Sequence, residues 1–375
     1  MNIISTHNRI VYIDNLKVFA IFLVVLGHIC MNYGKNNEIA IYHYGILPYH
    51  MPLFAIISGL FFNAQINFKS FVSKKFIQIA LPFLLWCFIV AVVIRGIDET
   101  YRHFTEGFTI HFKSWGECLF MFVVDWGWWF LRDLFVSFIY AYIAIQLLGR
   151  NVLIGVFLSV VLLYMLSLSG IFPNKWNKEF VFLYPFFCSG ILLKEYKHFI
   201  FSKEKTVLLV SSLTFIVCML FWQGHDDTFY SMNTSMLEQE GHAGITGWMV
   251  PVKIVYRFIT GLSASVMLIL LARRYERHLP THPFVMSIGR NTLGIYILHD
   301  FAFQIFAPPS SHILFENRAV SLVVCLAISV VLVIVCDGIV ELTSRNQWLA
   351  LLLWGKQKKK ETKEYVKNVF NQSVL

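Results

Sequence analysis

Three ionisable residues interrupt the first long apolar stretch of the chain, YIDNLKVFAIFLVVLGHICMNY, at spacings suited to chemistry. Asp14, Lys17 and His28 lie in a segment that otherwise predicts a membrane-spanning helix. Charge in hydrocarbon is costly, so a span that keeps it usually has a use for it. Eleven residues separate Lys17 from His28, which places them on one helix face, about 16 Å apart along the axis. The spacing of Asp14 and Lys17 predicts an ion pair one turn apart.

A purely structural interpretation of these residues is also open. A lysine near a helix start can extend its charged end to the membrane interface, and a neighbouring helix can satisfy a histidine. For Lys17 both interpretations stand. Because His28 lies deep in the span, we favour a functional role for it.

Composition defines the broad class. Of the 375 residues, 57% are hydrophobic and 14% are charged, whereas soluble domains carry about 25% charged residues. The chain is therefore predicted to be a polytopic membrane protein. The first span is not a secretory signal peptide, because Asp14 and Lys17 break its apolar core. The seven cysteines show neither metal-ligand spacing nor a disulfide framework, so we interpret them as small core residues.

The predicted fold class is all-α, a transmembrane helix bundle of about ten spans. Apolar runs of sufficient length occur at roughly 11–33, 45–64, 76–96, 127–148, 151–169, 179–194, 206–222, 250–272, 284–306 and 318–341. Lys and Arg favour one set of connecting segments by 19 to 7, which predicts that both termini are cytoplasmic. The net charge of +9 follows this topology, so no nucleic-acid partner is expected. Residues 1–345 are the predicted membrane domain, and 346–375 form a basic tail suited to anionic lipid.

Other candidate residues are polar or aromatic groups at span ends or one turn inside a span; they are His50, Lys75, Trp129, Arg132, Tyr296 and His299. Arg132 is followed by Asp133 and is expected to line a polar cavity. The outer loop 223–249 contains His225, Asp226 and Asp227, but matching ligands are missing elsewhere, so no metal is predicted.

Several segments together resemble one family. YIDNLKVFAIFLVVLGH, HMPLFAIISGLFF, WFLRDLF, LYPFFCSGILLKE and IGRNTLGIYILH occur in the order expected of the acyltransferase-3 family of integral-membrane acyltransferases. The resemblance covers about residues 10–345 and fits the stand-alone form, without a fused esterase-like domain. The family's first span has a basic residue, ten further residues and then a histidine, and Lys17 here replaces the commoner arginine. The family's Arg-x-x-Arg pattern reads Lys75 and Gln78 here, so one cation is kept.

The resemblance implies acyl transfer, usually of acetyl, from cytoplasmic acyl-coenzyme A to a hydroxyl of a glycan across the membrane. It implies that His28 and Asp14 are catalytic. Donor-binding residues would be Lys17, Lys75 and Arg132, and acceptor-binding residues would be His50, Trp129, Tyr296 and His299. Histidine suits this chemistry because it is a base near neutral pH. Direct transfer and an acyl-histidine intermediate both remain open.

The expected partners are acetyl-coenzyme A, a cell-surface polysaccharide or its lipid-linked precursor, and lipid of the inner (plasma) membrane. A homodimer is an open alternative. A transporter or exporter of a glycan intermediate is the competing function, because the same polar residues would line a permeation path. Transporters often contain repeats and paired broken helices, and the sequence shows neither.

Overall fold

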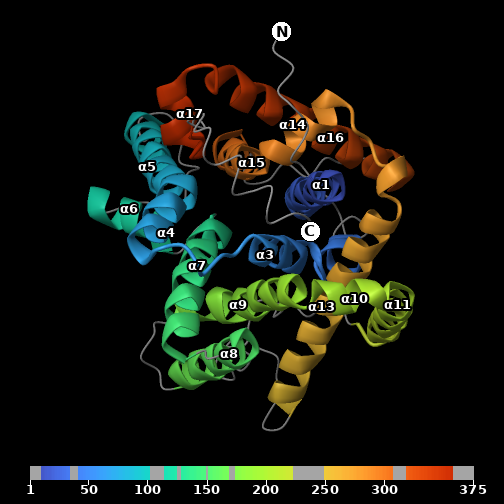
Figure 1. Ribbon diagram of the computed structural model, residues 1–375. Helices are drawn as coiled ribbons and strands as arrows, with labels where there is room; N and C mark the ends of the chain where they lie inside the picture. The colour runs from blue at the N-terminus through green and yellow to red at the C-terminus, as the bar shows by residue number, and fades with distance from the viewer. Residues whose placement is uncertain are drawn as a thin grey trace, which may run out of the picture.

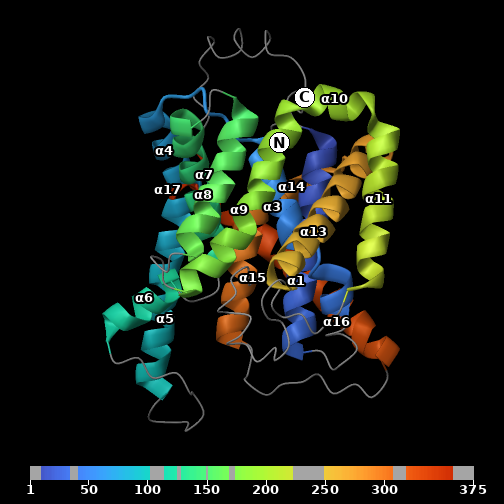
Figure 2. The same cartoon turned by 90° about the horizontal axis from the view of Figure 1, so that it is seen from below.

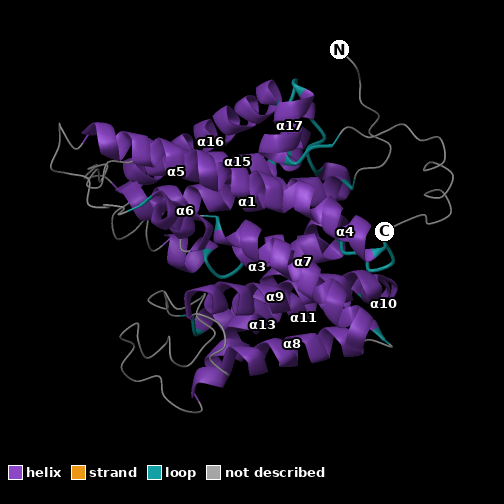
Figure 3. Cartoon of the chain, turned by 90° about the vertical axis from the view of Figure 1, so that its left-hand side faces the viewer, coloured by secondary structure: helices purple, strands orange, loops and turns teal. Residues whose placement is uncertain are grey.

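The computed structural model is helical throughout the part of the chain that it describes, with no strand there (Figures 1 and 3). That part comprises residues 10–33, 41–101, 114–124, 128–148, 151–168, 174–222, 249–306 and 318–357. The predicted all-α class is therefore confirmed for these residues. The predicted loop residues His225, Asp226 and Asp227 lie outside the described part.

The helices, in chain order, are α1 (Val11–Tyr33), η1 (Ile41–Ile46), α3 (His50–Leu60), α4 (Phe68–Lys75), η2 (Phe76–Ala80), α5 (Leu81–Tyr101), α6 (Trp115–Val124), α7 (Trp129–Leu148), α8 (Val152–Leu168), α9 (Asn174–Glu195), α10 (Lys197–Ser202), α11 (Glu204–Leu220), α13 (Met249–Arg274), η4 (Glu276–His278), α14 (Pro283–Arg290), α15 (Thr292–Phe306), α16 (Arg318–Thr343) and α17 (Gln347–Trp354).

Each of the ten predicted spans coincides with helix, but the helices differ in length and continuity. Five described segments are long and apolar enough to cross a membrane: Val11–Met31, Phe68–Val93, Trp129–Leu148, Val252–Arg274 and Ala319–Thr343. The second predicted span is divided between η1 and the 11-residue α3. The ninth is divided at Asn291. Such breaks are tolerated where neighbouring helices satisfy the freed backbone groups. The count of ten spans and the cytoplasmic termini remain predictions.

Helix α1 is central to the bundle. It packs against α3, α13, α14, α15 and α16, and Figure 1 shows it between the α14–α16 group and α3. Viewed at 90° to this, the long helices run roughly alongside one another (Figure 2). Ala20, Ile21 and Val25 of α1 are completely buried. The polar residues of α1 can therefore meet side chains from both parts of the bundle.

Helices α3 and α9 touch backbone to backbone. A Cβ atom added at Gly59 would collide with the carbonyl oxygen of Phe187, and one added at Gly190 would collide with the carbonyl oxygen of Ile56. Small residues permit such close approach of membrane helices. The contact fixes α3, which begins at His50.

The first part of the predicted tail packs on the bundle. Helix α17 ends at Gly355, whose φ of 63° is the left-handed conformation that favours glycine. The indole N–H of Trp86 in α5 donates to the carbonyl of Leu353 at 3.2 Å, and the Trp86 and Trp354 rings lie 5.5 Å apart. The basic residues from 358 onward lie outside the described part, and the division at 345 remains a prediction.

We expect Gly59→Ala to destabilise the protein by about 1–3 kcal/mol, because overpacking at a rigid contact forces the backbones apart. The thermal unfolding midpoint of the purified protein in detergent would measure this effect. Gly338→Ala in α16 is the matched control, since an added Cβ there meets nothing within 4 Å. An unchanged midpoint for Gly59→Ala would contradict the close α3–α9 packing.

Candidate active site

The predicted ion pair on α1 is present. The Nζ atom of Lys17 lies 3.8 Å from Oδ1 of Asp14, whose side chain is 7% exposed. The backbone of Asp14 also packs closely on Gly289 of α14. Fourteen residues separate Asp14 from His28, which is about 21 Å along the helix. The two residues predicted as catalytic therefore do not touch, and Asp14 acts on Lys17 instead.

His28 of α1 lies against His299 of α15. The ring centroids are 5.1 Å apart and the rings cross at 64°. His299 is completely buried, whereas His28 is exposed although Gly27 and Ile29 beside it are buried. The boundary between accessible space and packed interior thus passes between the two rings. His28 is thus the more open of the two residues, and His299 is enclosed by the protein interior.

Two histidines have a defined tautomer. The Nδ1 atom of His299 lies 3.0 Å from the carbonyl oxygen of Ile295, and Nδ1 of His50 lies 3.0 Å from that of Ile46. A carbonyl can only accept, so each Nδ1 carries the proton and each Nε2 keeps a lone pair. His50 is also within electrostatic range of His28. The fold therefore brings together three histidines that the sequence places on separate helices.

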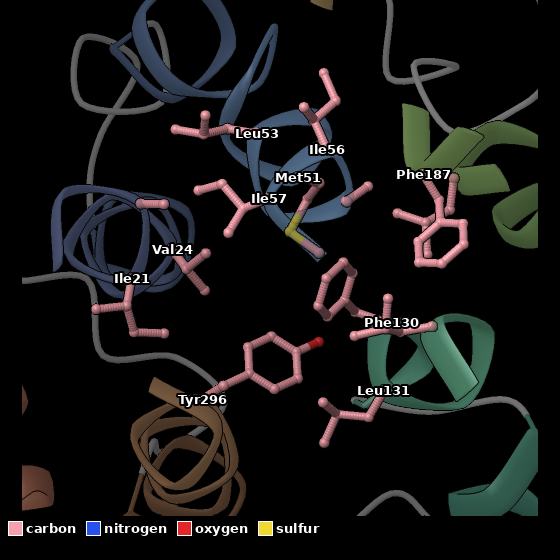
Figure 4. Packing of buried hydrophobic residues seen from close by; sticks show 14 of the residues in the cluster. Ile21, Val24, Met51, Leu53, Ile56, Ile57, Phe130, Leu131, Phe187 and Tyr296 are labelled. Atoms are coloured by element: carbon pink, nitrogen blue, oxygen red, sulfur yellow. The ribbon is translucent and has the colours of Figure 1, made fainter. Parts of the chain in front are cut away.

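Aromatic rings connect the histidines to α7. The ring of Tyr296 lies 5.7 Å from that of His299 and 5.9 Å from that of Phe130. Trp129 contacts Phe130 in turn, at 6.1 Å between centroids. Figure 4 shows the Tyr296 hydroxyl directed toward Phe130 and Leu131. Tyr296 and His299 are therefore connected to Phe130 and Trp129 by a continuous series of ring contacts.

Arg132 is held by two carboxylates. Its Nε donates to Asp133 at 2.8 Å and its Nη2 donates to Glu179 at 2.8 Å. The Arg132 side chain is 8% exposed. The donor-binding role predicted for Arg132 remains a prediction. In this structure its Nε and Nη2 groups are bonded to carboxyl groups of the protein.

Three lysines surround the end of α3. Lys17 lies 5.2 Å from the Phe61 ring centroid, and Lys194 donates to the carbonyl oxygen of Phe62 at 2.7 Å. Lys75 lies 3.5 Å from the Phe138 ring centroid, and that ring stacks on Phe62 at 6.4 Å. We call Lys17, Lys75 and Lys194 the lysine cluster. The contact of Lys194 was not predictable from the sequence, because a lysine after an apolar run ordinarily indicates membrane topology.

The sequence analysis also missed a polar cluster where α14 meets α15. Asn291 donates from Nδ2 to Asp337 at 2.7 Å and to Glu341 at 2.9 Å, both on α16. Lys356, which follows α17, donates to Asn291 Oδ1 at 2.7 Å and to Ser344 at 2.9 Å. Burial lowers the pKa of Lys356, and the Glu341 carboxylate opposes this effect. The cluster fixes the start of α15, the helix that carries His299.

The fold and the site define a helical membrane protein with a polar, histidine-containing interior. A family model described as "Acyltransferase domain" matches residues 10–338. The chain therefore belongs to the acyltransferase-3 family, and the resemblance drawn from its motifs is confirmed.

Two curated relatives cover most of the chain. Nodulation protein NolL of Sinorhizobium fredii is 26% identical over 323 residues, 80% of each chain. Nodulation protein NolL of Mesorhizobium japonicum is 23% identical over 329 residues, 80% of this chain and 78% of the relative. No solved structure matches the chain significantly.

We expect Lys356→Met to lower the free energy of unfolding by about 1–3 kcal/mol, because it leaves Asn291 Oδ1 without its donor. Chemical or thermal unfolding in detergent would measure the loss. Lys69→Met is the control, since Lys69 is exposed. Equal stability of the two variants would show that the cluster does not hold the tail.

Proposed function

We propose that the protein is a membrane-embedded O-acyltransferase of the inner membrane. It moves an acyl group, most simply acetyl, from cytoplasmic acyl-coenzyme A to a hydroxyl of a cell-surface polysaccharide or its lipid-linked precursor. The observation that carries this proposal is the contact between the exposed ring of His28 and the buried ring of His299. This contact supports a role for His28 as a base that is open on one side and packed against the protein interior on the other.

In the proposed reaction His28 accepts the proton of the acceptor hydroxyl. The hydroxyl oxygen then attacks the thioester carbonyl carbon, so a C–O bond forms and the C–S bond breaks. The leaving thiolate takes the proton from His28 and departs as free thiol. In the alternative route a nitrogen of His28 attacks the thioester carbonyl carbon, so a C–N bond forms, the C–S bond breaks and coenzyme A leaves as the thiol with a proton from the ring. The acceptor oxygen then attacks the acyl carbon, the C–N bond breaks, and the hydroxyl proton returns to His28. Both routes are balanced without a metal or an oxidant.

The lysine cluster supports the donor side of the proposal. The phosphates of coenzyme A are anionic, and lysine ammonium groups bind phosphate through charge-assisted hydrogen bonds. Lys17 and His28 share a face of α1, about 16 Å apart along the axis. The long arm of coenzyme A between its phosphates and its thioester suits this separation. Asp14 contributes by pairing with Lys17.

His50 and Tyr296 support the acceptor side. His50 keeps its Nε2 lone pair, because its Nδ1 donates to the Ile46 carbonyl. Tyr296 carries a hydroxyl that can donate or accept, and its ring contacts that of His299. Trp129 adds an apolar face with an N–H at its edge, which suits a sugar ring. These groups would orient one hydroxyl toward His28.

We expect His28→Ala to abolish acylation while the protein still accumulates in the membrane, because the variant loses the base at the accessible end of the histidine pair. Mass spectrometry of cell-surface glycan from strains with wild type, variant or no copy would test this. His278→Ala is the matched control, since His278 is exposed in η4. Normal acylation with His28→Ala would refute the mechanism. Unmodified glycan in every strain, with altered export, would favour the transporter alternative.

We expect Lys17→Ala to raise the KM for acyl-coenzyme A about tenfold and to change the KM for the acceptor little, because a charge-assisted hydrogen bond contributes about 1.5–3 kcal/mol. Steady-state kinetics of purified protein in detergent would separate the two constants. Lys69→Ala serves as a control for lost surface charge. An unchanged donor KM would remove Lys17 from the donor site.

A further inference from the structure

We propose that Arg132 acts on the acceptor side of the reaction, where it positions Glu179 and Asp133 to bind an uncharged sugar. The inference rests on the proposed function and deepens it, because it assigns the acceptor a chemical class. It also moves Arg132 away from the donor phosphates to which the family pattern assigned it.

The Arg132 guanidinium is already held by two acidic side chains. Arg132 donates from Nε and Nη2 to both oxygens of Asp133, at 2.8 and 3.3 Å, and from Nη2 to Glu179 at 2.8 Å. We call these three residues the Arg132 network. A phosphate arriving at this guanidinium would have to compete with two carboxyl groups that already accept its hydrogen bonds.

The Arg132 network lies close to the ring contacts of the candidate active site. Phe130 precedes Arg132 by two residues on α7, and its ring lies 5.9 Å from that of Tyr296, which lies 5.7 Å from that of His299. The start of α7 is thus linked to the histidines through the Phe130 and Tyr296 rings.

Arg132 and the lysine cluster lie at different heights along α7. Arg132 occupies the first turn of α7, whereas Phe138, which carries Lys75 over its ring, lies six residues further on. That separation is about 9 Å along the axis. Beyond it, the Tyr142 hydroxyl donates to the carbonyl of Ile66 in the segment between α3 and α4. The lysine cluster and the Arg132 network therefore lie at different levels of one helix, and an anionic donor is attracted to the lysine level.

Trp128, close to Arg132 in the chain, has a buried indole N–H group. The carbonyl of Trp128 accepts the backbone N–H of Arg132, so the two residues share a turn. The Trp128 side chain is 1% exposed. Its indole N–H has no hydrogen-bond partner in the described part of the chain. A buried N–H without a partner is costly, and a ligand oxygen would satisfy it.

These groups together match a neutral sugar. Carboxylates accept hydrogen bonds from hydroxyls, and the indole N–H of Trp128 donates to an oxygen. Glu179 is the more open of the two acidic residues, since its side chain is 21% exposed and that of Asp133 is 3% exposed. A sugar that itself carries a carboxylate or a phosphate would have to approach these acidic groups and would bind less well than a neutral sugar. Arg132 is accordingly a positioning residue that holds Glu179 in place.

A binding experiment tests the placement of Arg132 without any turnover. Equilibrium binding of labelled coenzyme A would be measured on the purified full chain for wild type, Arg132→Gln, Glu179→Gln and Lys17→Ala. We expect Lys17→Ala to weaken binding about tenfold and the other two variants to bind as wild type does. Glu179→Gln keeps an oxygen for Arg132 to bond, so it remains informative if Arg132→Gln fails to fold. Coenzyme A binding weakened by Glu179→Gln or by folded Arg132→Gln would overturn the proposal.

A transfer experiment tests the acceptor class. Acetyl transfer would be compared between an uncharged hexoside and the matching hexuronide, each on the same lipid-like aglycone. We expect the wild-type kcat/KM to be about tenfold or more higher for the hexoside than for the hexuronide. Glu179→Gln should raise the KM for the hexoside and reduce this ratio. The control is Glu204→Gln, which alters another glutamate–arginine pair, with Arg273, and should leave the preference unchanged.

The remaining outcomes separate this inference from the proposed function. A wild-type preference for the hexuronide would overturn the inference and leave acyl transfer standing. The inference would also be overturned if Glu179→Gln lowered kcat on both acceptors and left the preference for the hexoside unchanged. That result would indicate that Glu179 has only a structural role. A wild-type protein that binds no coenzyme A would contradict the proposed function itself.

Discussion

Charged and polar groups placed inside an apolar bundle must find their partners within the protein, and the site depends on this constraint. Membrane hydrocarbon offers no hydrogen bonds, so each such group is costly unless another helix satisfies it. Arg132 of α7 therefore donates a hydrogen bond to Glu179 of α9, and Asn291 donates to two carboxylates of α16. These pairings hold helices in register that apolar packing alone would let slide.

The same constraint gives the site two polar regions. The lysine cluster lies around the end of α3, and Asp133 and Glu179 hold Arg132 near the start of α7. The histidine pair is linked to the first through α1 and to the second through the Tyr296 ring. In the proposed reaction this separation directs an anionic donor and an uncharged acceptor to different sides of His28.

Much of the fold was predictable because hydrophobic length is a strong signal in membrane proteins. All ten predicted spans contain helix, and the Asp14–Lys17 pair followed from spacing on a single helix. The breaks in the second and ninth predicted spans were not predictable, because hydropathy remains high across them. The contribution of Lys194 was missed for a related reason. Its role depends on the carbonyl of Phe62, which is 132 residues away in the chain.

The sequence by itself determined the class of protein, its helical segments and the identity of its reactive residue types, since these depend on composition and local spacing. The sequence also identified the family, because motifs in a fixed order remain recognisable where overall identity is low. Only the tertiary structure decided which of those residues meet. It placed His28 against His299, separated Asp14 from His28, and paired Arg132 with two carboxylates. Contacts between helices depend on packing angles and register, which no single helix encodes.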